Sequence, residues 1–255
     1  MKTHVYIDGY NLYYGRLRTT PYKWLDVGAL ARRVVHAQNP ASEVTCIRYF
    51  TAPALAKYAR RGDASVNAQS AYHRALDWLH MGLVDGSKHR QVIYPPGASP
   101  PRFQIIYGNH SLHDNVSRPR YTEGVGPSKA DQVKVWEVVE KETDVNIALA
   151  MYRDVAKGLA EQVVLFSNDS DALPALRALR QDFPSLVVGV VAPIEAGQSH
   201  SSEQLRKEAT WHRGSIDVSD LVACQLPQVV TRQGTHGQKS KPPIFKPDHW
   251  GPDNP

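Results

Sequence analysis

One apolar run that ends in two carboxylates constrains this chain more than any other stretch. Residues 163–166 are all Val, Leu or Phe, as expected for a strand that is buried on both faces of a parallel sheet. Residues 167–171 follow as a turn, and residues 172–180 have the composition of a helix. In open α/β sheets, ligands bind beyond the carboxyl ends of such strands. The two acids could also be local, with Asp171 as a helix cap and Asp169 as a turn former.

Strand-like and helix-like segments alternate along the rest of the chain. This order predicts a three-layer α/β/α, Rossmann-like fold with a mainly parallel central sheet. Residues 109–129 are polar and are expected to form a mobile loop. The predicted strands are 5–7, 43–51, 90–94, 102–107, 132–140, 163–166 and 186–191, and the predicted helices are 27–36, 66–79, 145–159, 172–180 and 202–209.

A change of composition divides the chain near residue 227. Residues 228–255 contain five Pro and three Gly, with several basic residues and few core-forming ones. Such a composition is typical of a disordered basic tail. We therefore expect one domain over residues 1–227 and a tail over residues 228–255.

The overall composition is that of a globular protein. Hydrophobic residues make up 42% and charged residues 22% of the 255 positions, and no apolar run reaches the length of a membrane span. The N-terminus lacks a signal-peptide pattern, and Cys46 and Cys224 lack metal-ligand spacing, so a cytoplasmic location is expected. His89, His110 and His113 are not spaced as zinc ligands and are expected at the surface. The net charge of +5 permits a polyanionic partner.

Four aspartates follow predicted strands or precede a predicted helix, and a parallel sheet could bring them together at one edge. Carboxylates that converge need a cation between them, and oxygen-only ligands favour Mg²⁺ or Mn²⁺. Such an ion activates a bound water for phosphodiester hydrolysis. Local roles are the alternative, with Asp144 as a helix cap and residues 8–11 as a turn. The four aspartates are Asp8, Asp144, Asp169 and Asp171.

Residues 6–12, 141–145 and 167–171, in this order, resemble the NYN domain of the PIN-like, FLAP-nuclease-like superfamily. The resemblance covers roughly residues 3–220 and implies a PIN-type fold, a divalent-metal site and RNA cleavage. The five positions that match the family's acidic site are Asp8, Asn11, Asp144, Asp169 and Asp171. Ala150 stands where the family often has a further acid.

The resemblance implies a divalent-metal-dependent endoribonuclease with Asp8, Asp144, Asp169 and Asp171 as metal ligands. RNA, single-stranded or structured, would be the partner, and the oligomeric state is left open with a homodimer as one alternative. Other functions left open are an RNA- or protein-binding module with a weakened metal site, and a structure-specific DNase. The residues expected to contact substrate are Asn11, Tyr14, Arg16, Asn168, Ser170 and Lys141.

Overall fold

Six parallel strands form the central sheet, in the order β3-β2-β1-β6-β7-β8. The structure is a computed structural model that describes residues 1–80, 101–198, 200–231 and 241–250. The predicted strand over 90–94 lies outside these ranges. The strands of the sheet are β1 Lys2–Asp8, β2 Glu43–Thr51, β3 Arg102–Tyr107, β6 Gln162–Phe166, β7 Val187–Val191 and β8 Trp211–Arg213.

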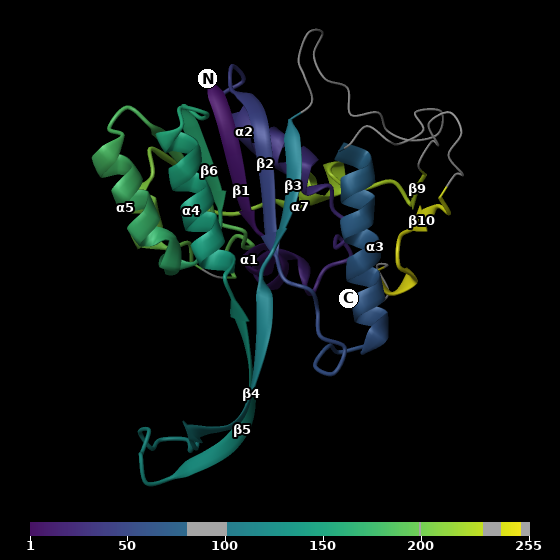
Figure 1. Cartoon of the computed structure of the whole chain (residues 1–255), viewed down its shortest axis with the longest axis vertical. Coiled ribbons are helices and arrows are strands. Elements are labelled where there is room, and N and C mark those ends of the chain that lie inside the picture. The colour runs from purple at the N-terminus through teal and green to yellow at the C-terminus, as the bar shows by residue number, and fades with distance from the viewer. Residues whose placement is uncertain (81–100, 199, 232–240, 251–255) are drawn as a thin grey trace.

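Side chains that alternate along the strands divide the core into two layers. Val5 and Ile7 of β1 pack into one cluster, and Tyr6 between them packs into the other. This is the two-residue period of a strand that is covered on both faces. Figure 1 shows helices on both sides of the sheet. The predicted three-layer α/β fold is therefore confirmed.

Each layer of helices presents an apolar side to one face of the sheet. Residues of α2 and α3 contribute to the cluster with Val5, and residues of α4 and α5 to the cluster with Tyr6. Helix α2 begins where predicted because Asp26 caps it, accepting the N–H of Ala29 at 2.8 Å. The helices are α2 Val27–Gln38, α3 Asp63–His80, α4 Thr143–Ala156, α5 Leu173–Asp182, α6 Glu203–Glu208 and α7 Val218–Ala223.

The direction in which the chain crosses the sheet reverses at β1. From β1 the chain moves outward to β2 and β3, and it later returns to the other side of β1 with β6, β7 and β8. This is the Rossmann strand order, in which ligands bind where the carboxyl ends of the two central strands diverge. That point lies between Asp8, the last residue of β1, and the residues that follow Phe166 at the end of β6.

A two-stranded antiparallel ribbon, here called the arm, projects from the body of the molecule (Figure 1). It consists of β4 Asn109–Pro119 and β5 Gln132–Lys141, with an irregularity in the pairing between His113 and Val116. The strand predicted over 132–140 is confirmed. The expectation of a loop was wrong for residues 109–119, because pairing with β5 satisfies the backbone of this polar stretch.

Parts of the range expected to be a tail are packed on the domain. Val229–Val230 (β9) pairs with Ile244–Phe245 (β10), and the side chains of Val230 and Ile244 are buried in the core. Trp250 lies against Trp24 and Tyr72, with ring centroids 6.0 and 5.7 Å apart. No helix of the described residues is long and apolar enough to cross a membrane.

Candidate functional site

Three carboxylates meet at the carboxyl edge of the sheet. Carboxylate oxygens of Asp144, Asp169 and Asp171 lie within 4.8 Å of one another. Asp169 and Asp171 follow β6, while Asp144 comes from the start of α4. Burial raises the pKa of Asp144, and the nearby charges of Asp169 and Asp171 raise it further. The structure thus brings together three of the four predicted acids.

Asp8 lies behind this group and is buried, with 4% of its surface exposed. Its Oδ1 accepts the N–H of Asn11 at 2.9 Å, and its Oδ2 accepts the hydroxyl of Ser167 at 3.0 Å. Burial raises the pKa of Asp8 to about 6, and the charges of Asp144 and Glu140 act in the same direction. Gly9 is required here because a Cβ would lie 2.6 Å from the carbonyl oxygen of Phe50.

Two asparagines brace the loops around the acids. The side-chain oxygen of Asn11 accepts the N–H of Asn168 at 2.9 Å, which ties the end of β1 to the end of β6. Asn168 in turn accepts the N–H of Ser202 at 2.6 Å and donates to the carbonyl of His200 at 3.1 Å. Both were predicted to contact substrate, and the structure gives them bonds that position the site.

Helix α4 starts two residues earlier than predicted. Its N-cap is Glu142, at a φ of +78°, so Asp144 lies within the first turn instead of preceding the helix. A carboxylate in that position is stabilised by the positive end of the helix dipole. Ala150, on the same helix, is half-buried and packs against the core cluster that contains Tyr6.

The remaining predicted substrate residues differ in exposure. Tyr14 is 57% exposed, on a π-helix over Tyr13–Leu17 that directly follows the short helix α1, Gly9–Leu12. Ser170 and Lys141 are exposed as well. Arg16 is buried instead, and its Nε donates to the carbonyl oxygen of Ile216 at 2.8 Å. The guanidinium of Arg16 thus braces the fold rather than facing the edge.

The base of the arm brings residues close to the acids that the sequence analysis did not place there. The hydroxyl of Tyr10 lies 2.8 Å from Nε2 of His110. His110 was expected at the surface, and the structure shows it half-buried. Glu140 is close enough to raise the pKa of Asp8, and burial raises the pKa of Glu140 itself. The sequence signal for Glu140 was its position four residues before Asp144, whereas no local pattern connects His110 with the acids.

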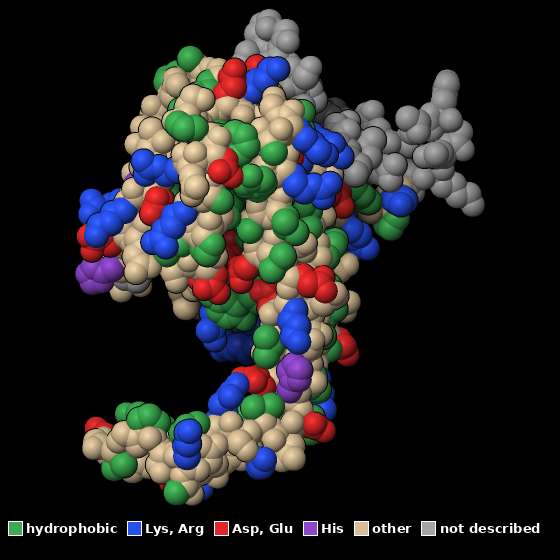
Figure 2. Space-filling view, turned by 60° about the vertical axis from the view of Figure 1, so that its left-hand side comes forward, with side chains coloured by type: hydrophobic (Ala, Val, Ile, Leu, Met, Phe, Trp, Pro, Cys, Tyr) green, Lys and Arg blue, Asp and Glu red, His purple; other side chains and the backbone are tan. Residues whose placement is uncertain are grey.

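Acidic side chains gather at the lower end of the body in Figure 2, facing the hollow between the body and the arm. Asp144 and Asp171 are exposed, and Asp169 is half-buried. An edge of this charge attracts cations and groups that donate protons, and it repels anions. A negatively charged substrate would therefore need a separate cationic contact.

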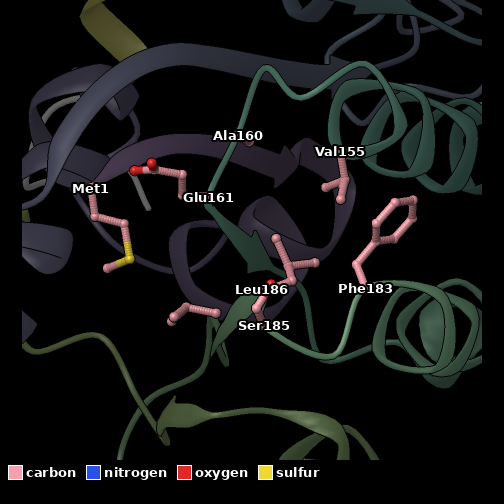
Figure 3. A pocket seen from close by; sticks show the side chains of 8 residues that line it. Met1, Val155, Ala160, Glu161, Phe183, Ser185 and Leu186 are labelled. Carbon is pink, nitrogen blue, oxygen red and sulfur yellow. The ribbon is translucent and has the colours of Figure 1, made fainter.

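A pocket of 520 Å³ lies elsewhere, at the amino ends of the strands (Figure 3). It is lined by side chains such as Met1, Val155, Phe183 and Leu186, with Glu161 as its acidic member. The carboxylate of Glu161 accepts the backbone N–H of Lys2 at 2.7 Å. This pocket is at the edge opposite to the four aspartates, so the candidate site remains at the carboxyl edge.

Comparison with known proteins gives one extensive match. The chain is 35% identical over 266 residues to the 6-hydroxy-3-succinoylpyridine 3-monooxygenase HspA of Pseudomonas putida (strain DSM 28022 / S16), covering 98% of this chain and 75% of that protein. No protein-family model matches. A crystal structure of a protein of unknown function from Vibrio parahaemolyticus RIMD 2210633 aligns with a TM-score of 0.42 at 15% identity, covering 85% of this chain and 93% of that one.

The match overturns the expected function. A relative that covers nearly the whole chain is a monooxygenase, so the resemblance to the NYN family and the prediction of a ribonuclease were wrong. The alternatives of an RNA- or protein-binding module with a weakened metal site and of a structure-specific DNase are not supported either. Mg²⁺ or Mn²⁺ was expected as the ion that activates water for phosphodiester hydrolysis. Because the nuclease prediction was wrong, the prediction of this metal was wrong as well. Ala150 was noted because the NYN family often has an acid at that position, and this comparison no longer applies. The homodimer stays a prediction.

Proposed function

Since the chain belongs to the family of the 6-hydroxy-3-succinoylpyridine 3-monooxygenase HspA, we propose that it is itself a monooxygenase that acts on a hydroxypyridine with an acidic side chain. The observation that carries this proposal is the 35% identity, which extends over 98% of this chain and 75% of the relative. An alignment of that extent includes the residues of the whole sheet edge, not one shared motif.

Monooxygenation places one oxygen atom of O₂ in the substrate and releases the other as water, using two electrons from a reductant. Nicotinamide and flavin dinucleotides are common reductants, and Rossmann folds hold their pyrophosphate on a Gly-rich turn after the first strand. Here that turn begins with the buried carboxylate of Asp8, and Asp144 lies close to it. These residues do not fit a pyrophosphate, so we assign no step to a dinucleotide at this edge.

We assign the proton chemistry to the carboxylates of the edge. The carboxylate of Asp144 is exposed, and its raised pKa makes it a better proton acceptor than an ordinary aspartate. It would accept the proton of the ring hydroxyl, which makes the ring richer in electrons and favours attack on oxygen. Asn11 and Asn168 would hold the loops in place, and Asp169 would keep the pKa of Asp144 raised.

The decisive test is the source of the inserted oxygen. The purified protein is incubated with 6-hydroxy-3-succinoylpyridine under ¹⁸O₂, with NADH or NADPH and with or without FAD or FMN. We expect consumption of substrate and O₂, and one ¹⁸O atom in the product by mass spectrometry. Unchanged substrate in every combination, or oxygen that comes only from water, would overturn the proposal.

A paired substitution tests the assigned proton acceptor. Asp144→Asn removes the charge with little change of shape, and it should lower the turnover rate on the order of 10²-fold, as for loss of a general base. Asp114→Asn is the control, because Asp114 is an exposed aspartate of the arm. Equal rates for the two variants would remove Asp144 from the mechanism and leave the oxygen-insertion test unaffected.

A further inference from the structure

A cluster of tyrosines begins two residues after Asp8 and extends outward from the acidic edge. Tyr14 packs against Tyr10 with ring centroids 5.7 Å apart, and against Tyr13 edge to face at 5.1 Å. Tyr13 is 38% and Tyr14 57% exposed. Tyrosine rings usually bury more of their apolar faces, so two adjacent exposed rings offer a surface on which a planar ligand can stack.

The backbone that carries these rings is unusual. Tyr13–Leu17 is a π-helix, which inserts an extra residue per turn and is frequently found at functional sites. It leaves Tyr13 and Tyr14 in solvent while Arg16 and Leu17 are buried. The hydrogen bond from Arg16 to the carbonyl oxygen of Ile216 holds this segment on the body, so the exposed rings lie on a fixed support.

Arg18, four residues after Tyr14, completes the cluster. The guanidinium carbon of Arg18 lies 5.4 Å from the centroid of the Tyr14 ring, and the residue is exposed. Among the described residues, no carboxylate forms an ion pair with Arg18. Arg18 and Arg60 both oppose the rise in the pKa of Tyr13 that burial causes, which places positive charge at this end of the cluster.

The two ends of the site thus have opposite charge. The end formed by Asp144, Asp169 and Asp171 repels a carboxylate, while Arg18 attracts one. Tyr10 joins the two ends, because it packs on Tyr14 and its hydroxyl reaches His110 at the base of the arm. Acidic side chains, aromatic rings and a cationic side chain thus follow one another in space. A ligand with a planar ring and a side chain that ends in a carboxylate is complementary to this order.

On the basis of the proposed function, the geometry points to Tyr14 and Arg18 as the anchor for a heteroaromatic acid. Tyr14 stacks on the pyridine ring, and Arg18 pairs with the carboxylate at the end of the side chain. The ring hydroxyl is then directed toward the acidic edge. These residues determine which hydroxypyridines bind, and they take no part in the oxygen chemistry.

Binding without turnover tests the anchor. Calorimetry is performed without reductant, using 6-hydroxy-3-succinoylpyridine and its analogue 6-hydroxy-3-acetylpyridine, which has no carboxylate. We expect Arg18→Gln to weaken binding of the succinoyl compound about tenfold or more and to leave binding of the acetyl compound unchanged. Tyr14→Leu should weaken binding of both compounds, and Tyr14→Phe, which keeps the ring, should bind both as the unchanged protein does. Arg153→Gln, at an exposed arginine of α4, is the control and should leave the affinity for both compounds unchanged.

Kinetic data separate this inference from the proposed function. If the unchanged protein inserts ¹⁸O but Arg18→Gln has the same KM and the same affinity, the anchor is wrong and the oxygenase stands. If the protein binds the compound through Arg18 and inserts no oxygen, the anchor stands and the oxygenase is wrong. If the protein binds neither compound, the anchor is overturned along with the substrate class.

Discussion

The burial of Asp8 opposes folding when its carboxylate is charged. Asp8 is buried, and its pKa rises from 3.8 to about 6. Between these two values the folded state binds more protons than the unfolded state, so stability falls as the pH rises from about 4 to 6 and stays lower above that range. A protein keeps such a residue for its function, because the charged form destabilises the fold at neutral pH.

Asp8→Asn should therefore stabilise the protein at pH 7.5. Asparagine still caps the turn and carries no charge, so the free energy of unfolding should rise by at most about 3 kcal/mol. The gain should shrink toward zero near pH 4. Urea titrations of both proteins at pH 4.5 and 7.5 measure it, and an equal difference at the two pH values would show that the buried charge is not its cause.

At the scale of single residues, the sequence predicted that the acids lie at one edge of the sheet, but it did not predict the hydrogen bonds around them. Asp8 ends one strand and Asp169 follows another, and the apolar composition of both strands marks them as central, so the place of these acids at one edge could be predicted. The bond between Asn11 and the backbone of Asn168 joins residues 157 positions apart, and no local pattern specifies it. Glu140 and His110 reach the site only because β4 pairs with β5, and the sequence analysis predicted β5 but expected a loop in place of β4.

At the scale of elements, burial decided which predictions succeeded. The predicted bounds of β2, 43–51, agree with the structure. The apolar residues along this strand indicate that it is buried on both faces, as the structure shows. Strand β4 has mostly exposed side chains and is held by its ladder with β5, so it lacks the apolar pattern of a buried strand. Helix α4 was predicted, but its start was misplaced by two residues.

Trp250 tests whether the segment after β10 is part of the domain. Its contacts with Trp24 and Tyr72 predict that Trp250→Ala lowers the free energy of unfolding by about 1–3 kcal/mol. The control is Trp136→Ala on the arm, where the ring is 61% exposed and the loss should be about 0.5 kcal/mol. Urea denaturation gives both values, and equal losses would show that Trp250 does not dock.

The outer half of the arm should be dispensable for folding. Its side-chain hydrogen bonds among the described residues, such as Arg118 to Glu137 and Arg120 to Asp131, stay within the arm. Replacing residues 117–134 by Asn-Gly would join Val116 and Val135, which are already paired, through a tight turn. We expect the melting temperature to change by only about 2 °C. A large decrease in a thermal scan would show that the arm supports the body.

At the scale of the whole molecule, β1 holds the two halves of the sheet together. It pairs with β2 on one side and with β6 on the other, and its side chains enter both core layers. A fragment over residues 1–156 lacks β6 and most of the core around Tyr6. We expect it to show no cooperative transition in urea and little protection of amides from hydrogen exchange. A sharp transition in this fragment would show that the first half folds alone.

The central place of β1 has a consequence for how the protein is made. Lys2 and its partner Glu161 are 159 positions apart, and ribosomes add about 5–20 residues per second. The edge of β1 that pairs with β6 therefore stays unpaired for roughly 8–30 s, because β6 has not yet been synthesised. Unpaired edges of this kind join other chains readily. We therefore expect this protein to be most exposed to association with other chains during translation, before β6 has been synthesised.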